Sequence, residues 1–500
     1  MIALLTIIIS FIGALLCGLT PAHYHRQIRW YALFTALLGL SVGVCCWLRY
    51  DEPGAIADMI EFPWIPEIGV KFITGFDGIS LPLLLVTGLV AVCGVLFTWD
   101  LDQRANEFYA YYFVLIGGVY GVFLSLDLFL LFIFYEIAVV PKYFLITNWG
   151  GERREFAAMK LVLYSFAGSA LVLLGMLAIY FTAGAETFDL NELGFLAGKE
   201  RFTPGFQAVV FPILFLGFAI LAGMWPFHTW VPTGHVAAPT AASMLLAGVV
   251  MKLGAYGCLR VAVGLLPAGA QLWAPLIAVV AIVNIVYGAL VALRQNDFKF
   301  VIGYSSVSHM GFVLLGIATL HTIGLTGAVL QMFSHGIIGA ALFAMVGTVI
   351  YTRTHTRMLD DFHRLMDRMP AIAWVFVVAG LASMGLPGFS GFISELYVLI
   401  GVWQSSILSG WSGWIVVGAG LGILLTFGYT LVKIHEAFFS ERDTTEANGE
   451  PMTAYSPMTI PEIIGCAILL GASLLIGLFP WLLTSRIVPS LEIIIDRLPN

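Results

Sequence analysis

The amino-acid sequence predicts an all-α polytopic membrane protein, and three observations support this fold class. Of the 500 residues, 60% are hydrophobic and only 11% are charged, whereas a soluble globular chain carries about 25% charged residues. Apolar stretches of membrane-spanning length follow one another along the chain. The longest polar stretches between them, 49–77, 184–207 and 440–460, are too short for a soluble domain. These features exclude a soluble multidomain enzyme.

Fourteen stretches are long and apolar enough to form transmembrane helices, each of which needs roughly 20 mainly apolar residues. The first has neither a basic segment before it nor a clear cleavage site, so we expect a retained helix rather than a signal peptide. The predicted spans are 2–19, 29–48, 78–98, 108–125, 127–148, 157–183, 208–231, 240–264, 272–294, 300–319, 324–350, 371–404, 411–439 and 461–484.

The distribution of Lys and Arg predicts the orientation of the chain. With the N-terminus outside, fourteen Lys and Arg residues fall in inner segments and seven in outer segments. Because basic residues are in excess on the inner side of a membrane, both termini are predicted on the outer side. In this assignment Lys142 and Lys433 count as inner residues and Arg260 as an outer residue, while Lys160 and Lys252 lie within spans.

The cysteines argue against a metal or cofactor site built from this chain. All six lie in apolar runs, and none is spaced as CxxC: Cys17, Cys45, Cys46, Cys93, Cys258 and Cys466. Iron–sulfur and zinc sites need clustered thiolates, so the sequence predicts neither a metal nor a resident cofactor.

Two spans contain helix-breaking residues. Pro226 and Pro232 interrupt 223–232, and Pro387 with three glycines interrupts 385–392. Proline removes a backbone donor, and paired interruptions in two halves of a transporter indicate its transport site. Their separation of about 160 residues predicts two five-helix repeats, 108–264 and 272–439, between an N-terminal segment 1–107 and a C-terminal segment 440–500. Two ordinary proline kinks are the alternative.

Five ionisable residues lie near the middle of five different predicted spans: Glu136, Lys252, His309, His335 and Glu395. Each costs about 2.5–3.5 kcal/mol at the bilayer centre on insertion scales, and residues of this kind usually serve transport. Imidazole titrates near neutral pH, so histidines can pass protons between carboxylates and amines. The pattern predicts a proton relay, and the sequence contains no evident catalytic nucleophile or nucleotide-binding loop.

Structural roles are the alternatives for some of these residues. Glu136 and Lys252 could form one buried ion pair, although such pairs often fail to repay their desolvation. Glu395 could satisfy open backbone at the second break. Lys160, about one turn inside its helix, could extend its amine to the inner face.

The two histidines also have a structural alternative. His309 and His335 could be neutral core residues that are hydrogen-bonded to Ser306 or Gln331.

Six segments near the breaks and the buried ionisable residues have distinctive sequences: FYEIAVVPKYFLI (134–146), PFHTWVP (226–232), APTAASMLLAGVVMKLG (238–254), YSSVSHMGF (304–312), QMFSHG (331–336) and GLPGFSGFISE (385–395). By these segments the chain resembles the antiporter-like membrane subunits of respiratory complex I, and the M-type subunits (mitochondrial chain four) are the most similar among them. The resemblance implies fourteen helices with two inverted five-helix repeats, each holding one broken helix.

The same resemblance implies a proton-translocating subunit of NADH:quinone oxidoreductase in a bacterial inner membrane. FMN, iron–sulfur clusters and quinone are then expected on partner subunits, and the contacts of this chain are neighbouring antiporter-like subunits and lipids, with no nucleic acid. Alternatives are a ferredoxin-driven photosynthetic complex in a thylakoid membrane, a cation/proton antiporter, a membrane-bound hydrogenase-type complex, or a structural spacer.

The resemblance also implies roles for the five residues. Glu136 is the charged residue of the first half-channel, Lys252 is the connecting lysine, and His309 and His335 continue the axis. Glu395 replaces the terminal lysine of sister subunits and opens to the outer side.

The first half departs from the family pattern at two places. The lysine expected five residues before the Pro of the Pro-Phe-His motif is Leu221 here, so Glu136 lacks its usual partner. Thr233 and Gly234 also replace the usual residues before His235. Lys160, His228 and His235 are accessory candidates, and Lys160 or Lys252 could replace the missing lysine.

Overall fold

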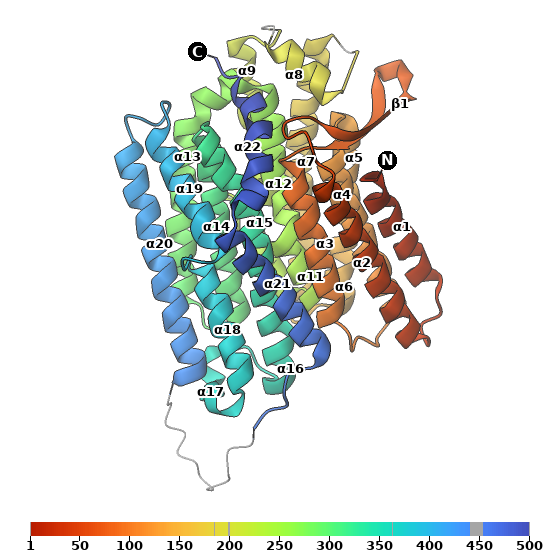
Figure 1. Cartoon of the computed structure of the whole chain (residues 1–500), viewed down its shortest axis with the longest axis vertical. Helices are drawn as coiled ribbons and strands as arrows, with labels where there is room; N and C mark the ends of the chain where they lie inside the picture. Colours follow the sequence, from red (N-terminus) through yellow and green to blue (C-terminus); the bar gives the residue numbers. More distant parts are fainter. Residues whose placement is uncertain (1, 185, 199–200, 363, 441–453, 500) are drawn as a thin grey trace.

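The computed structural model describes residues 2–184, 186–198, 201–362, 364–440 and 454–499. Its helices form one bundle, in which both chain ends and the strands lie toward the same end (Figure 1). We call this end the hairpin face and the other end, which carries α16 (Tyr351–Thr354) and α17 (Leu365–Arg368), the opposite face. Lys199 and Arg442, which entered the orientation count, lie outside the described residues.

The first half of the chain supplies a three-helix segment, a hairpin and the first group of spans. Its elements are α1 (Leu4–Leu19), α2 (His25–Leu48), β1 (Ala57–Ile65), the 3-10 turn η1 (Pro66–Ile68), β2 (Val70–Phe76), α3 (Ser80–Phe97), α4 (Ala105–Leu124), α5 (Leu128–Ile137), α6 (Val139–Trp149), α7 (Arg154–Ala183), α8 (Leu190–Gly198), α9 (Pro204–Ala222), α10 (Trp230–Ala237), α11 (Thr240–Leu245), the π-helix η2 (Leu246–Val250), α12 (Met251–Gly257) and the π-helix η3 (Cys258–Val263).

The second half continues with long helices and ends with two that cross the front of the bundle in Figure 1. Its elements are α13 (Pro267–Arg294), α14 (Phe298–Ala318), α15 (Thr322–Ala344), the π-helix η4 (Met345–Ile350), α16 (Tyr351–Thr354), the 3-10 turn η5 (Leu359–Asp361), α17 (Leu365–Arg368), α18 (Pro370–Ser383), α19 (Ser390–Gln404), α20 (Ser412–Ile434), the π-helix η6 (His435–Phe439), α21 (Ile460–Leu478) and α22 (Trp481–Ile495).

The polytopic helical fold is confirmed. Within the described residues, twelve continuous helical stretches are long and apolar enough to cross a membrane, and two shorter apolar helices are α1 and α18. Together these fourteen correspond to the fourteen predicted spans. One boundary was wrong: the last span, predicted as 461–484, ends at Leu478, and Pro480 begins a separate helix, α22. The division into repeats stays a prediction.

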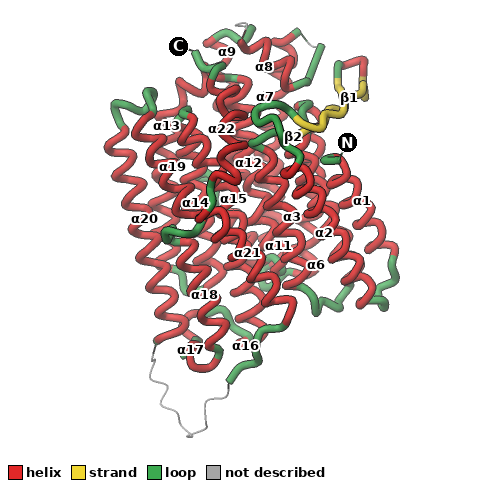
Figure 2. The backbone as a smooth tube through the Cα atoms, viewed as in Figure 1, coloured by secondary structure: helices red, strands yellow, loops and turns green. Residues whose placement is uncertain are grey.

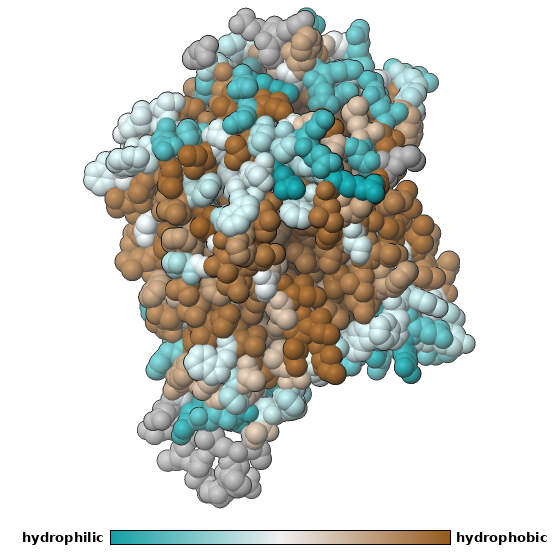
Figure 3. Space-filling view, viewed as in Figure 1, coloured by the Kyte–Doolittle hydropathy of each residue, from teal (hydrophilic) through white to brown (hydrophobic). Residues whose placement is uncertain are grey.

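The surface shows why these helices need a membrane. On the face shown in Figure 3, a belt of hydrophobic side chains covers the middle of the bundle, and the two ends are more polar. Large apolar side chains on the peripheral helices α1 and α20 are exposed, as Leu19 and Trp414 illustrate at 81% and 78%. The stretches α3, α11–η3, α14 and α15 are almost wholly buried. Polar groups on these inner helices therefore face other helices rather than lipid.

The 49–77 stretch, expected as a polar connection, contains a two-stranded antiparallel sheet that lies at the side of the bundle near the hairpin face (Figure 2). Phe62 and Phe72 are paired in register and their rings stack at 4.8 Å between centroids. Lys71 contacts Glu61 at 3.1 Å and Glu192 at 2.9 Å. Its hydrogen bonds to Glu192 and Glu61 raise the pKa of Lys71, so the hairpin is joined to α8 by a persistent positive charge.

Asp127 joins the hairpin to the start of α5 and makes the fold sensitive to pH. Its Oδ1 accepts from Phe129 N at 2.9 Å and Leu130 N at 3.0 Å, and its Oδ2 accepts from Lys71 N at 3.1 Å. Burial raises the pKa of Asp127 to about 6, above the ordinary value of about 3.9. A raised carboxyl pKa favours the folded state below about pH 4, and this contribution is lost as the pH rises through 6.

We expect Asp127→Asn to change the pH dependence of stability. The asparagine amide keeps the Oδ1 acceptor for the start of α5 but loses the hydrogen bond from Lys71 N. This loss lowers the free energy of unfolding by the same amount at every pH. The variant should gain on the parent chain between pH 4 and 6.5, by an amount on the order of 2 kcal/mol. Melting temperatures of the purified assembly at each pH measure this. Parallel pH profiles for the two proteins would contradict the assignment.

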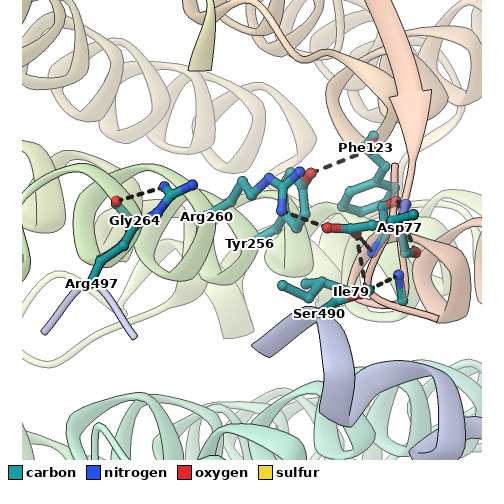
Figure 4. A network of polar contacts seen from close by, with 12 residues as sticks. Asp77, Ile79, Phe123, Tyr256, Arg260, Gly264, Ser490 and Arg497 are labelled. Atoms are coloured by element: carbon teal, nitrogen blue, oxygen red, sulfur yellow. Dashed lines mark hydrogen bonds and ion pairs between the residues drawn. The ribbon is translucent and has the colours of Figure 1, made fainter. Parts of the chain in front are cut away.

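A buried polar network at the hairpin face joins three distant segments (Figure 4). Arg260 on η3, which the orientation count placed in an outer segment, has a side chain only 13% exposed, and its Nη1 donates to Asp77 Oδ2 at 2.6 Å. Gly78 N donates to Ser490 Oγ on α22 at 2.9 Å, and Tyr50 OH lies 3.3 Å from the same oxygen. The network fixes the end of the central α11–η3 stretch.

Candidate functional site: a row of buried polar groups

The first predicted helix break is confirmed and is closed by polar contacts from neighbouring segments. α9 ends at Ala222 and is followed by Gly223, which has φ +83°, and α10 begins at Trp230. Asn284 on α13 donates to Gly223 O at 3.0 Å and accepts from Trp225 N, while Trp230 Nε1 donates to Ile220 O at 2.9 Å. Interrupted backbone at membrane depth needs such partners, so the break is a built feature rather than a kink.

The second predicted break is also confirmed. α18 ends at Ser383 and α19 begins at Ser390, with Gly385 and Gly388 at φ +75° and +104° between them. Glu395 is on α19 and 5% exposed. Its carboxylate lies over Gly385, because a Cβ there would be 3.0 Å from Glu395 Oε2. Glycine therefore makes the room that the carboxylate occupies.

Lys252 and His335 are in direct contact at the centre of the bundle. The Lys252 Nζ lies 2.7 Å from His335 Nδ1 and also donates to Ala247 O. Both side chains are buried. Lys252 lies on α12 between the π-helices η2 and η3. Single π-helical turns inside α-helices occur frequently at functional sites.

His309 connects this pair to Glu395. The rings of His309 and His335 are 5.7 Å apart between centroids. His309 Nδ1 lies 3.4 Å from Glu395 Oε1 and 3.4 Å from Gln331 Nε2, and its Nε2 lies 3.4 Å from Ser383 Oγ. Four of the five predicted relay residues therefore form one row in which each contacts the next.

Small hydroxyl groups surround this row. Ser394 donates to Gln331 Oε1, and Ser390 Oγ lies 2.8 Å from Ser334 Oγ and 3.0 Å from Ser473 Oγ. A small cavity of about 10 Å³, room for about one water molecule, lies beside His309 and His335. Groups that both donate and accept are the components that proton transfer along hydrogen bonds requires.

Glu136 lies apart from the row, and its basic neighbour is Lys142. The carboxylate is a hydrogen-bond partner of Ser169 on α7, and the charges of Glu136 and Lys142 act on each other. Within the described residues, Glu136 Oε1 and Lys142 Nζ have no hydrogen-bond partner and form no direct ion pair. The Glu136–Lys252 pair weighed as an alternative is absent there too, because Lys252 contacts His335 instead.

The assignment of Lys142 to an inner loop was wrong. The residue lies on α6 and is 1% exposed. The apolar residues 137–141 and 143–146 on both sides of it were the sequence signal for burial. Because Lys142 was counted among the inner basic residues to predict the orientation of the chain, its apolar neighbours were not taken as evidence that it is buried. Lys433, which was also counted with the loop residues, lies on α20 and is 7% exposed.

Leu221 lies on α9, packs in the hydrophobic core of the bundle and is 2% exposed. Its helix approaches α12 closely, since a Cβ on Gly254 would lie 2.4 Å from Phe218 O. Phe218 also contacts Tyr135, the neighbour of Glu136, at 5.8 Å between ring centroids. α9, which carries Leu221, therefore packs against the helix that carries Glu136, while Lys142, whose charge acts on Glu136, lies on α6.

The three accessory candidates are Lys160 on α7, His228 in the first break and His235 on α10. Lys160 Nζ donates to Thr233 Oγ1 at 3.3 Å. The His228 ring is 5.2 Å from the Tyr287 ring, and the His235 ring stacks on Phe343 at 4.9 Å. No nitrogen of either histidine has a hydrogen-bond partner in the described part of the chain.

Comparison with known proteins gives consistent matches over the whole chain. The family model described as NADH:quinone oxidoreductase/Mrp antiporter, TM, matches residues 125–422. NAD(P)H-quinone oxidoreductase chain 4 of Gloeobacter violaceus is 36% identical over 97% of this chain and 91% of its own length. A chain 4 protein of Synechococcus elongatus is 38% identical over 96% and 88%.

Solved structures agree in fold. A chain of respiratory complex I from Thermus thermophilus superimposes with a TM-score of 0.89 at 25% identity, over all of both chains. A chain of the Mrp complex from Dietzia sp. DQ12-45-1b has a TM-score of 0.84 at 21% identity, over 99% of this chain and 98% of that chain, and shows the shared fold. With more than half of its length matched by the family model, the chain belongs to the NADH:quinone oxidoreductase/Mrp antiporter family of transmembrane subunits.

Proposed function

We propose that this chain is a proton-translocating membrane-arm subunit of a complex I-type NAD(P)H-quinone oxidoreductase. The observation that carries the proposal is the row of Lys252, His335, His309 and Glu395, in which successive groups lie 2.7 Å to 3.4 Å apart or have ring centroids 5.7 Å apart. The four residues come from α12, α15, α14 and α19. Protonation of one group changes the charge that the next experiences, which is what a relay requires.

The chain itself carries no redox chemistry in this proposal. FMN, iron–sulfur clusters and quinone belong to partner subunits in this proposal, and the relatives are named as chains of an NAD(P)H-quinone oxidoreductase. The partners are neighbouring antiporter-like subunits and lipids. The membrane is a bacterial inner or a thylakoid membrane, with the hairpin face on the outer side in agreement with the excess of basic residues in the other loops.

Replacing Glu395 with glutamine tests the proposal. We expect the number of protons translocated per electron to fall in vesicles that contain the assembled complex, because the neutral amide cannot accept a proton from His309. The measurements are vesicle acidification and quinone reduction in the same preparation. The control is Glu107→Gln, whose side chain is 40% exposed and paired with Arg104. An unchanged ratio in Glu395→Gln would refute the role of this residue in the relay.

A further inference from the structure

A polar cavity at the hairpin face lies between the last helix of the chain and the end of the central α11–η3 stretch. Its volume is about 60 Å³, which leaves room for a few water molecules or one small anion. Polar side chains from four separate segments line it: Asp77 after β2, Asn191 on α8, Arg260 on η3, and Ser490 and Arg497 on and just after α22. Two arginines and one carboxylate therefore share one cavity wall.

The carboxylate of Asp77 is occupied by other groups of the chain. Its Oδ2 accepts from Arg260 Nη1 at 2.6 Å, and its Oδ1 accepts from Ile79 N and Ser80 N at 3.0 Å each (Figure 4). The charge of Asp77 is thus balanced by Arg260 and by the amides at the start of α3. It does not serve as the partner of the second arginine.

Arg497 has no carboxylate partner within the described residues. Its Nη1 donates to Gly264 O at 3.4 Å (Figure 4), and this is its one hydrogen bond in that part of the chain. The guanidinium also packs against α8, where a Cβ on Gly194 would clash with Nη1. A guanidinium carries five N–H donors and stays protonated in proteins. Arg497 therefore brings a partly buried positive charge to the cavity, with most of its donors unused.

The charge and the donors of the cavity wall select an anion. Two arginines and one aspartate leave one net positive charge. Among the described residues, Arg260 also makes one hydrogen bond, that from Nη1 to Asp77. Guanidinium groups bind phosphate oxygens through two parallel N–H donors, and the Asn191 amide can donate as well. A partly buried charge without a partner costs free energy, which a bound oxyanion would offset.

We propose that this cavity binds a phosphate group between Arg260 and Arg497. The group belongs either to inorganic phosphate or to the headgroup of an anionic phospholipid, and both present the same oxygens to the arginines. Bound there, it joins the end of α22 to η3 and α8, and so strengthens the attachment of the last helix. The site is separate from the row of Lys252, His335, His309 and Glu395, and it does not rest on proton translocation.

Binding of phosphate to the purified assembled complex tests the site. Equilibrium dialysis with radiolabelled inorganic phosphate and native mass spectrometry with added phosphatidylglycerol distinguish the two sources, at constant ionic strength. We expect Arg497→Gln to bind one equivalent less of one of these probes than the parent complex. The matched control is Arg486→Gln, also on α22, whose guanidinium lies 4.6 Å from the centre of the Trp47 ring and does not line the cavity. This control should bind like the parent.

A second variant keeps the test decisive if Arg497→Gln does not assemble. Arg497→Lys retains the charge but loses the paired donors, so it should bind the same probe on the order of tenfold more weakly. The probe should also raise the melting temperature of the parent more than that of either variant. Equal binding of both probes by the parent and the Arg497 variants would overturn the site. Loss of a neighbouring subunit from the Arg497→Gln complex, with both probes bound as in the parent, would overturn it in favour of a protein carboxylate.

Discussion

Lys252→Met is expected to stop proton translocation through this chain while quinone reduction by the assembled complex continues or becomes uncoupled. The Lys252 Nζ is the group that contacts His335, and methionine fills a similar volume without an ionisable atom. General acid–base groups contribute about 10²–10⁴-fold to the steps that they serve, so the loss should be the largest among single substitutions. Vesicle acidification per quinone reduced measures it.

A second buried lysine provides the control for this variant. Lys299 on α14 is 6% exposed, and its Nζ donates to Ala238 O at 3.1 Å instead of contacting the row. Lys299→Met removes a buried positive charge of the same kind and should retain most of the translocation. If both variants pump normally, the relay through Lys252 is wrong. If both variants fail to assemble, Lys252→Arg is used instead. Arginine keeps the positive charge but does not release its proton, so a loss of translocation in this variant shows that a titratable group is needed at position 252.

Lys142→Leu is expected to lower proton translocation strongly, and adding Leu221→Lys is expected to restore part of it. The first change removes the amine whose charge acts on Glu136. The second returns an amine to the same region from α9, because Phe218, one turn before Leu221, contacts the neighbour of Glu136. Initial rates of vesicle acidification in the single and double variants show whether an amine at position 221 can replace the amine of Lys142.

The pattern among the variants distinguishes a specific pair from general damage. Leu221→Lys alone puts two amines near one carboxylate, so it should assemble less well or pump less than the parent. A double variant that is worse than both single variants would contradict the exchange. Lys160→Met is the matched control, since Lys160 contacts Thr233 and not Glu136. Its loss should change translocation less than the loss of Lys142.

The membrane fold was accessible from the sequence because every span is a continuous apolar run of sufficient length. The two broken helices were accessible because Pro226 and Pro387 interrupt such runs beside glycines. The boundary at Leu478 was not, because Phe479 and Trp481 keep the run apolar across Pro480. The hairpin escaped notice because its strands mix charged with aromatic residues, and only pairing across the turn makes them a sheet.

The members of the candidate site were easier to predict than their contacts. An ionisable residue in an apolar run is visible in any sequence, which is how Lys252, His309, His335 and Glu395 were found. That Lys252 contacts His335 rather than Glu136 depends on how α12 and α15 pack, and no local pattern encodes this. Lys142 shows the opposite difficulty: its apolar neighbours were informative, but its charge was used for another purpose.

The Asp77–Arg260–Ser490 network has a consequence for biosynthesis. Gly78 and Ser490 are 412 positions apart, and Arg260 lies between them in the order of translation. The early spans enter the membrane long before the serine that secures their junction exists. Until then Arg260 has Asp77 as a partner and the Gly78 amide has the Tyr50 hydroxyl at 3.1 Å, but the Ser490 oxygen is missing. This junction is therefore completed only when α22, the last helix of the chain, has been made.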